Sequence, residues 1–510
     1  MNPPLSLIQF GQGGIFLRKS VPILYSALML TGVNLLLRLA GTAFQVYLSA
    51  RIGAAGIGLL QLTMSVGNLS MVAAMAGIRT AAMYLTAEEL GRGREENVAP
   101  VLSGCFLYSI LCSGAVAVFI FFFSPTIAIN WIGNEQILGA LRLFAVFLPC
   151  SCLSGVMTGY FTAANRIGTL AGVEVAEQIF SMGVTLTALT FWAGTDATRA
   201  CQSVILGGCL GSCFTLICLS ILLLREHPAV DSRIPMTRRL YHTAVPLALA
   251  DDVKSGINTV ENLMVPKRLA LNTTVASPLA AFGTVTGMVF PVLMFPACIL
   301  FGLAELLIPE LARCAAGGKQ MRIRYLVHRS LKVAMLYGLL FGGLEYLLAD
   351  TLCLKLYNNA EAGKFLKLYA LLIPMLYCDA IVDAMTKGLG QQKLCVRYNI
   401  LTSALDVFFL FLLLPKYGIK GYFFSFLITH LLNFLLSLGA LFRIIGRSVP
   451  LYTPVMACAA SLAAIYMTTY LSHPLLRMLV YPVILGCLLY LSGILRREDL
   501  RWLRSLIQKK

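Results

Sequence analysis

Long apolar stretches follow one another along almost the whole chain, and short runs of polar, glycine or proline residues separate them. Each stretch approaches the roughly 20 apolar residues that a helix needs to cross a bilayer, and far exceeds the roughly ten alternating residues of a barrel strand. The pattern therefore predicts an all-α membrane protein with about 14 transmembrane helices. The predicted spans are approximately 21–50, 57–88, 98–123, 137–163, 168–193, 201–224, 240–266, 277–312, 326–349, 362–386, 394–415, 419–442, 450–472 and 475–495.

Composition narrows the class of protein further. The 510 residues are 58% hydrophobic and 12% charged, yet 40 Lys and Arg stand against 23 Asp and Glu. A nucleic-acid-binding protein with this net charge of +17 would be richer in charged residues, so we expect no nucleic acid partner. Lys and Arg instead collect on the cytoplasmic side of membrane proteins. With the N-terminus inside, 25 cations fall on inside segments and ten on outside segments. We therefore expect a multi-pass protein of the cell membrane with both termini cytoplasmic.

The two halves of the chain share landmarks at a nearly constant offset. Pro22 recurs as Pro246, 224 residues later, and Pro149 recurs as Pro374 after 225 residues. Such a register predicts two six-helix lobes related by a parallel pseudo-symmetry, followed by two further helices. The predicted divisions are an N-lobe at 1–224, a cytoplasmic linker at 225–239, a C-lobe at 240–448, helices 13 and 14 at 449–495, and a basic amphipathic cytoplasmic tail at 496–510 that would lie on anionic lipids.

Polar residues inside the predicted helices 1, 2 and 7 recur every three or four positions, which places them on one face of each helix. Ionisable groups within a bilayer are costly and usually face a cavity or a partner. We therefore expect these faces to bind the substrate. An alternative is that Asp251 and Lys254 form an ion pair and that the amides hold helices together. The expected substrate-binding residues are Asn34, Arg38, Gln45, Asn68, Arg79, Asp251, Lys254, Asn258 and Glu261.

Neither the cysteines nor the histidines form a pattern that indicates chemistry. The 15 Cys lie mostly inside apolar stretches, and the five His are scattered without zinc-ligand or catalytic-triad spacing. We interpret the cysteines as small packing residues. The sequence therefore predicts no catalytic residues, no metal site, no cofactor and no enzyme activity, and leaves Na⁺ or H⁺ open as a coupling ion.

The segment 50–96 carries three short motifs, Gly56-Ile57-Gly58-Leu59, Ala76-Gly77-Ile78 and Ala87-Glu88-Glu89-Leu90-Gly91. In these motifs it resembles the stage V sporulation protein B group of polysaccharide exporters. That group belongs to the multidrug/oligosaccharidyl-lipid/polysaccharide (MOP) superfamily, with lipid II flippases and multidrug antiporters. The resemblance implies flipping of an undecaprenyl-pyrophosphate-linked saccharide, a polysaccharide or peptidoglycan precursor, to the outer leaflet. In a spore former it would serve the cortex, with cell-wall or sporulation enzymes as partners.

The lipid II flippases hold the pyrophosphate with arginines in the N-lobe cavity, and the resemblance assigns this role to Arg38, in Arg38-Leu39-Ala40-Gly41. This chain has Phe44-Gln45 where those flippases have an Arg-Asp pair. It also has no Lys or Arg between 277 and 308, where they carry a cavity arginine. The resemblance therefore implies a flippase without fixing lipid II as the cargo.

Three functions remain to be weighed. The first is an alternating-access flippase, with Arg38 and Arg79 as partners of the anionic head group. The second is a cation-coupled multidrug antiporter, in which Asp251, Asp252 and Glu261 bind Na⁺ or protons. The third is a membrane glycosyltransferase or polymerase, which would need a large outside loop, whereas the longest outside stretch is about 348–361.

Overall fold

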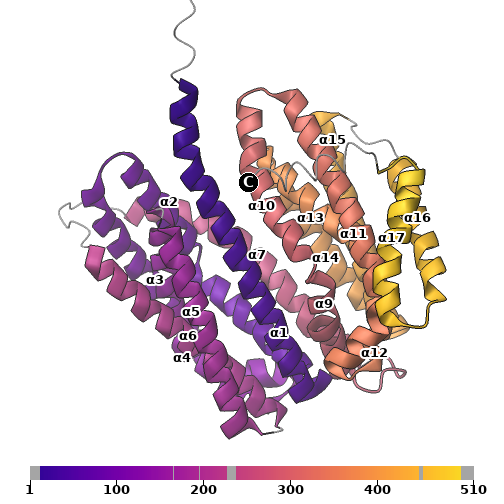
Figure 1. Ribbon diagram of the computed structural model, residues 1–510. Helices are drawn as coiled ribbons and strands as arrows, with labels where there is room; N and C mark the ends of the chain where they lie inside the picture. Colours follow the sequence, from indigo (N-terminus) through magenta and orange to yellow (C-terminus); the bar gives the residue numbers. More distant parts are fainter. Residues whose placement is uncertain (1–11, 165, 195, 227–236, 447–451, 496–510) are drawn as a thin grey trace, which may run out of the picture. The chain divides into compact units, whose positions relative to one another are not determined.

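The computed structural model describes residues 12–164, 166–194, 196–226, 237–446 and 452–495, which are almost entirely helical and contain no strand (Figure 1). The all-α class is therefore confirmed. The α-helices are α1 Gln12–Met75, α2 Ile78–Gly91, α3 Val98–Thr126, α4 Leu138–Ala163, α5 Ile167–Ala188, α6 Ala197–Glu226, α7 Thr237–Leu269, α8 Pro278–Gly283, α9 Phe290–Met294, α10 Ala297–Ala316, α11 Gln320–Tyr357, α12 Ala360–Ala370, α13 Ile373–Gly388, α14 Gln392–Tyr417, α15 Ile419–Ile445, α16 Tyr452–Thr469 and α17 Pro474–Leu491.

The helices fit a protein that crosses the membrane several times. Within the described ranges, eight helices are long and apolar enough to span a bilayer, or ten if each of two bent pairs is one span. Every stretch predicted from the sequence coincides with helix, but the number of about 14 spans is not confirmed. One reason is that α1 covers the first predicted span and most of the second. It bends at Gly53, whose φ of 70° and ψ of 178° only glycine adopts readily.

Each of the two bent pairs lies beside a proline. The segment Pro278–Met294 meets α10 at 65°, next to Pro296, and α12 meets α13 at 57°, close to Pro374. Pro149, the sequence counterpart of Pro374, lies inside the uninterrupted α4. Matching prolines of the two halves therefore have different structural effects.

Tyrosine side chains satisfy backbone carbonyls at the first of these breaks. The Tyr337 hydroxyl donates to the carbonyl of Pro296 at 2.8 Å, and the Tyr377 hydroxyl donates to the carbonyl of Leu293 at 2.9 Å. A break inside a membrane is tolerated where neighbouring side chains bond the freed backbone groups. The two tyrosines therefore stabilise the bend between α9 and α10.

The chain divides into two compact units. Unit 1 contains α1 up to Gly41 and then Val66–Ser255, while unit 2 contains Thr42–Ser65 and the chain from Gly256 onward. This boundary falls inside α7, and one piece of α1 is counted with the second unit. The proposed lobes at 1–224 and 240–448 stay a prediction. Residues 227–236 of the predicted linker and the predicted tail at 496–510 lie outside the described residues.

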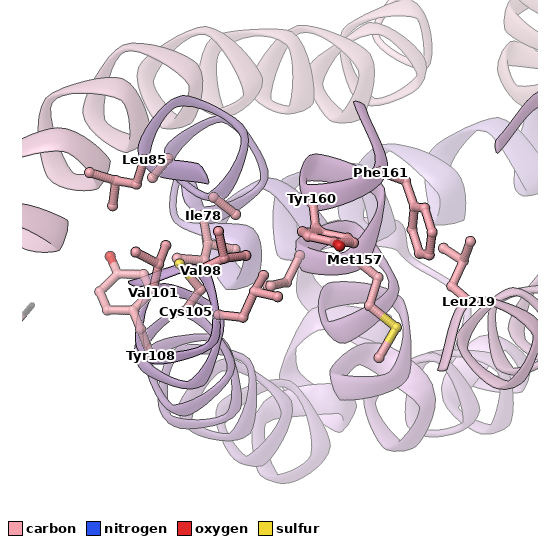
Figure 2. Packing of buried hydrophobic residues seen from close by; sticks show 14 of the residues in the cluster. Ile78, Leu85, Val98, Val101, Cys105, Tyr108, Met157, Tyr160, Phe161 and Leu219 are labelled. Carbon is pink, nitrogen blue, oxygen red and sulfur yellow. The ribbon is translucent and has the colours of Figure 1, made fainter. Parts of the chain in front are cut away.

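Unit 1 is packed around α2, α3, α4 and α6. Its buried cluster includes Ile78, Val101, Tyr160, Phe161 and Leu219, which Figure 2 shows meeting between these helices. Because lipid tails are as apolar as these side chains, a cluster of this kind stabilises membrane helices mainly through close van der Waals packing.

A break between α1 and α2 adjoins this cluster. Ala76 and Gly77 have φ values of 43° and 69° and so interrupt the helix before α2 begins. Gly159 of α4 lies so close that an added Cβ would be 2.5 Å from the Arg79 carbonyl oxygen. The Tyr108 hydroxyl donates to the Ala76 carbonyl at 3.3 Å. Close glycine packing and one hydrogen bond therefore hold the break.

Unit 2 is built around α11. Helices α12 and α13 pack on it, and α16 and α17, drawn in yellow in Figure 1, pack against it as well. Tyr481 of α17 is fully buried, and its hydroxyl donates to the Leu339 carbonyl of α11 at 2.8 Å. The last two helices are thus anchored to unit 2 by an apolar cluster and a buried hydrogen bond.

A seam of glycines joins α1 to the region of α8 within unit 2. An added Cβ would lie 2.3 Å from the Leu279 carbonyl oxygen at Gly58, and 2.0 Å from the Ala54 carbonyl oxygen at Gly283. At Gly287 it would lie 1.9 Å from a methyl carbon of Ile57. Only glycine allows these backbones to approach so closely.

Candidate functional site

A polar cavity of about 340 Å³ lies within unit 2, between α7, α9, α13, α14 and α15. Its lining includes three carboxyl groups and no Lys or Arg. The lining side chains are Asn258, Glu261, Asn262, Thr286, Phe290, Asp379, Asn399, Thr402, Ser403, Asp406, Tyr422, Phe426, Thr429, His430 and Asn433. We call this the acidic cavity.

Asp406 of α14 is its most firmly held carboxylate. The side chain is 7% exposed, and its Oδ1 accepts hydrogen bonds from Ser425 at 2.5 Å and Thr429 at 3.1 Å, both on α15. Glu261 of α7 lines the same cavity. Two acidic side chains from different helices therefore face one enclosed space.

Asp379 of α13 supplies the third carboxylate, and the Asn433 amide donates to it at 3.2 Å. Carboxylate, amide and hydroxyl oxygens are ligands that hard cations prefer. Among the described residues, however, no three His, Cys, Asp or Glu side chains converge on one metal position. The arrangement suits a proton, or a single small cation bound by carboxylates together with neutral oxygens.

The structure divides the polar face expected on helix 7. Asn258 and Glu261 line the acidic cavity, and their role in substrate binding stays a prediction. Asp251 and Lys254 belong to unit 1, are exposed and do not line it. Within the part of the chain that the structure describes, no ion pair joins these two side chains. The ion-pair alternative is therefore not what the structure has.

The expected residues on α1 occupy different environments. Gln45 is partly buried in unit 2, where its amide donates to the Gly287 carbonyl at 3.3 Å. Arg38 and Asn68 are exposed in unit 1. Asn34 lies in α1, and its side chain is outside the described set. The acidic cavity includes none of these residues.

Arg79 occupies the second position of α2, directly after the break at Ala76 and Gly77. Its side chain is exposed, and among the described residues no carboxylate lies within ion-pair distance. Glu174 of α5 attracts it electrostatically from farther away. Unit 1 thus presents a guanidinium that a ligand can reach without first displacing a bonded carboxylate.

Most of the acidic cavity could not be recognised in the sequence. Neither Asp379 nor Asp406 was assigned a role there, although Asp406 is the only acid in the apolar stretch 394–415. A carboxyl inside a predicted span is itself a signal of function. That signal identifies Asp406, whereas Asn399, Thr402 and Asn433 become part of a site only through packing.

Comparison with known proteins supports the expected resemblance. The MatE family model matches residues 31–185. Over 411 residues the chain is 21% identical to Stage V sporulation protein B of Bacillus subtilis (strain 168), covering 78% of this chain and 79% of that protein. The resemblance stated from the sequence motifs is thereby confirmed.

Solved structures share the fold. The lipid II flippase MurJ in an inward closed conformation matches with a TM-score of 0.68 at 14% identity, covering 94% of this chain and 100% of that one. An inward-facing multidrug resistance MATE family transporter of the MOP superfamily matches with a TM-score of 0.65 at 13% identity, covering 81% and 98%. These likenesses show that the chain shares the fold of those two transporters.

Proposed function

We propose that the protein is an alternating-access flippase that moves an undecaprenyl-pyrophosphate-linked saccharide from the cytoplasmic to the outer leaflet of the cell membrane. The observation that carries the proposal is the exposed guanidinium of Arg79 at the helix break of unit 1. The similarity to Stage V sporulation protein B and to the lipid II flippase MurJ supports the same class of cargo.

An arginine suits this cargo for a physical reason. Its planar guanidinium donates paired hydrogen bonds to phosphate oxygens, and these charge-assisted bonds are about twice as strong as neutral ones. A large amphiphile also needs an accessible cation rather than an enclosed one. Arg79 is exposed, and Arg38, likewise exposed, would provide a second contact for the pyrophosphate.

The acidic cavity supplies the driving reaction in this proposal. Glu261, Asp379 and Asp406 would bind a coupling Na⁺ or H⁺, and no Lys or Arg in the lining competes for the carboxylates. A cation that binds one conformation better than the other shifts the equilibrium between them. An ion gradient would thereby give direction to the movement of the saccharide.

Reconstitution tests the proposal directly. Proteoliposomes would contain fluorescent undecaprenyl pyrophosphate saccharides of differing head groups, and flipping would be followed by loss of accessibility to an added quencher. We expect Arg79→Ala to lower the flipping rate at least about tenfold, the loss of one charge-assisted contact, with partial recovery in Arg79→Lys.

Arg92→Ala is the matched control, because Arg92 terminates the same helix and pairs with Glu88 at 2.6 Å. It should flip the saccharide at the wild-type rate. Arg38→Ala should insert normally and lose flipping. Wild-type rates in both Arg38→Ala and Arg79→Ala would overturn the proposal.

A second candidate is a cation-coupled multidrug antiporter, which the aromatic lining of the acidic cavity favours. The rings of Phe426 and His430 lie 4.0 Å apart between centroids, and Phe290 lies 5.3 Å from Phe426. Aromatic faces and carboxylates together bind organic cations. Drug efflux that collapses with the ion gradient, in cells without any defect in envelope polysaccharide, would select this function.

The membrane orientation and the partners belong to the same proposal. Both termini would be cytoplasmic, the two predicted six-helix lobes would rock about a central site, and the basic tail 496–510 would lie on anionic lipids. Cell-wall or sporulation enzymes would supply or consume the saccharide. Protease digestion of sealed vesicles carrying terminal tags tests the orientation.

A further inference from the structure

Two side chains that flank Glu261 on α7 bond to a single residue of α1. The Thr259 hydroxyl donates to the Ser65 carbonyl at 3.1 Å, and the Asn262 amide donates to the Ser65 hydroxyl at 3.0 Å. Thr259 is 3% exposed and Ser65 is 7% exposed, so both bonds are shielded from solvent. Ser65 is therefore the point at which α7 holds α1 within unit 2.

The hydrogen bonds of Ser65 fix which way the Asn262 amide faces. The Ser65 hydroxyl donates its own hydrogen to the Gln61 carbonyl at 2.8 Å, so toward Asn262 it can only accept. The nitrogen of the Asn262 amide must face Ser65, and its oxygen stays available elsewhere. Asn262 also lines the acidic cavity, next to Glu261 in the chain. One side chain thus belongs to both the cavity and the contact with α1.

Ser65 lies where α1 passes from one unit to the other. It is the last residue of α1 that is counted with unit 2, and Val66 belongs to unit 1. The helix continues without interruption from there to Met75. A change in how firmly Ser65 is held would therefore be transmitted along a rigid helix into unit 1.

We propose that Asn262 is the positioning residue that couples cation occupancy of the acidic cavity to the hold of α7 on α1 at Ser65. The inference rests on the proposed function, in which that cavity binds the coupling ion. The inference assigns a role to the contact between Asn262 and Ser65, which is separate from the carboxylates that would bind the ion.

Cation binding and the contact with α1 are coupled because the Asn262 amide has both an N–H donor and an oxygen acceptor. In the empty cavity, the carboxyl groups of Glu261 and Asp406 would compete with Ser65 for the Asn262 N–H, because a carboxylate accepts a stronger hydrogen bond than a neutral hydroxyl. A bound cation neutralises these acceptors and attracts the amide oxygen instead. The N–H then stays on Ser65, so cation binding strengthens the contact between α7 and α1.

Ser65→Ala isolates this contact, because it removes the acceptor and leaves every cavity-lining side chain in place. Ser65→Thr restores the hydroxyl. Ser70→Ala is the matched control, since Ser70 is a buried serine of the same helix whose hydroxyl donates to the Val66 carbonyl at 2.7 Å. All variants would be prepared as the full chain.

Hydrogen–deuterium exchange of α1 peptides reads the contact without any cargo. Sodium chloride is compared with choline chloride at fixed pH, and a pH series distinguishes Na⁺ from H⁺. We expect the cation to slow exchange around Ser65 about fivefold in wild type, the equivalent of one hydrogen bond, and in Ser65→Thr and Ser70→Ala. Ser65→Ala should lose this protection, and because coupling is reciprocal its cation affinity, measured by titration calorimetry, should fall by the same factor of about five.

Three results would overturn the inference: no cation-dependent protection in wild type with either ion, protection that persists in Ser65→Ala, or a cation affinity in Ser65→Ala that falls far more than the protection does. The last result would make Ser65 a support of the cavity itself. Because exchange needs no lipid-linked saccharide, failure of flipping in the wild type would reject the proposed function and leave this test standing.

Discussion

The two units place their polar groups in opposite ways. Unit 1 presents Arg38 and Arg79 on exposed surfaces, and Arg79 has no carboxylate within ion-pair distance among the described residues. Unit 2 encloses Asp379 and Asp406 and surrounds them with hydrogen-bond donors. An exposed cation suits a large anionic ligand that arrives from outside, whereas enclosed carboxylates suit a small cation that must lose its water. The difference assigns cargo to one unit and coupling to the other in our proposal.

The helix breaks of the two units also differ, in how the backbone is stabilised at each break. In unit 1, Ala76 and Gly77 have positive φ values of 43° and 69°, and the Tyr108 hydroxyl donates to the Ala76 carbonyl at 3.3 Å. In unit 2, the bend before Pro296 keeps ordinary dihedral angles and receives two tyrosine hydrogen bonds of 2.8 and 2.9 Å. Unit 1 stores local backbone strain, and unit 2 satisfies its backbone with side chains.

The largest expected effect is on the enclosed carboxylate. Asp406→Asn should weaken cation binding about 100-fold, roughly 3 kcal/mol, because it removes a buried charge and keeps the shape of the side chain. Titration calorimetry with the coupling ion measures the change. Asp383→Asn is the control, since Asp383 pairs with Lys387 at 2.5 Å and does not line the cavity. Equal losses in both variants would contradict the separate role of Asp406.

A smaller effect is expected at the exposed cation. Arg79→Ala should weaken binding of inorganic pyrophosphate about tenfold, roughly 1.4 kcal/mol, because one charge-assisted contact is lost. Cation affinity in the acidic cavity should not change. Displacement of a fluorescent lipid phosphate measures the first quantity and calorimetry the second. A simultaneous loss of cation affinity would show that the functions are not divided between the units as proposed.

Two substitutions at the break of unit 1 should change the stability of the protein in opposite directions. Gly77→Ala places a side chain at a φ of 69° and should destabilise the protein by about 1–2 kcal/mol. Ala76→Gly relieves a φ of 43° and should raise stability by up to about 1 kcal/mol. Thermal unfolding in detergent, followed by tryptophan fluorescence, measures both. Shifts of the same sign would mean that this break holds no strain.

The smallest effect concerns the tyrosines of unit 2. Tyr377→Phe removes one buried hydrogen bond to the Leu293 carbonyl and should lower stability by about 1 kcal/mol. Tyr337→Phe should cost less, because its environment is only partly buried. The same unfolding assay ranks them. Wild-type stability in the double variant would remove the tyrosines from the explanation of the bend.

The helices could be predicted because each membrane span appears in the sequence as a local run of apolar residues. The bends beside Pro296 and Pro374 were also accessible, since proline removes a backbone donor wherever it lies in a helix. The break at Ala76 and Gly77 was not, because both residues are apolar and compatible with an uninterrupted span. The break depends on a tertiary contact, in which Gly159 of α4 packs closely against the backbone of α2.

Only those residues of the candidate site that share one helix face could be grouped from the sequence. The face of helix 7 placed Asn258 and Glu261 together through helical periodicity, and both line the cavity; their role in binding stays a prediction. The periodicity could not show that Asp251 and Lys254 fall into the other unit, nor that Asp406 lines the same cavity as Glu261. Those facts depend on how distant segments pack, and each segment contributes only one or two polar residues to the cavity.

The glycine seam of unit 2 has a consequence for how the sequence can vary. Where Gly58, Gly283 and Gly287 join α1 to the region of α8, there is no space for even one additional methyl group. A Cβ at Gly283 would lie 2.0 Å from the Ala54 carbonyl oxygen, so the two backbones would have to separate to admit it. The seam therefore restricts these positions to glycine, and Gly283→Ala should lower the stability of unit 2 itself.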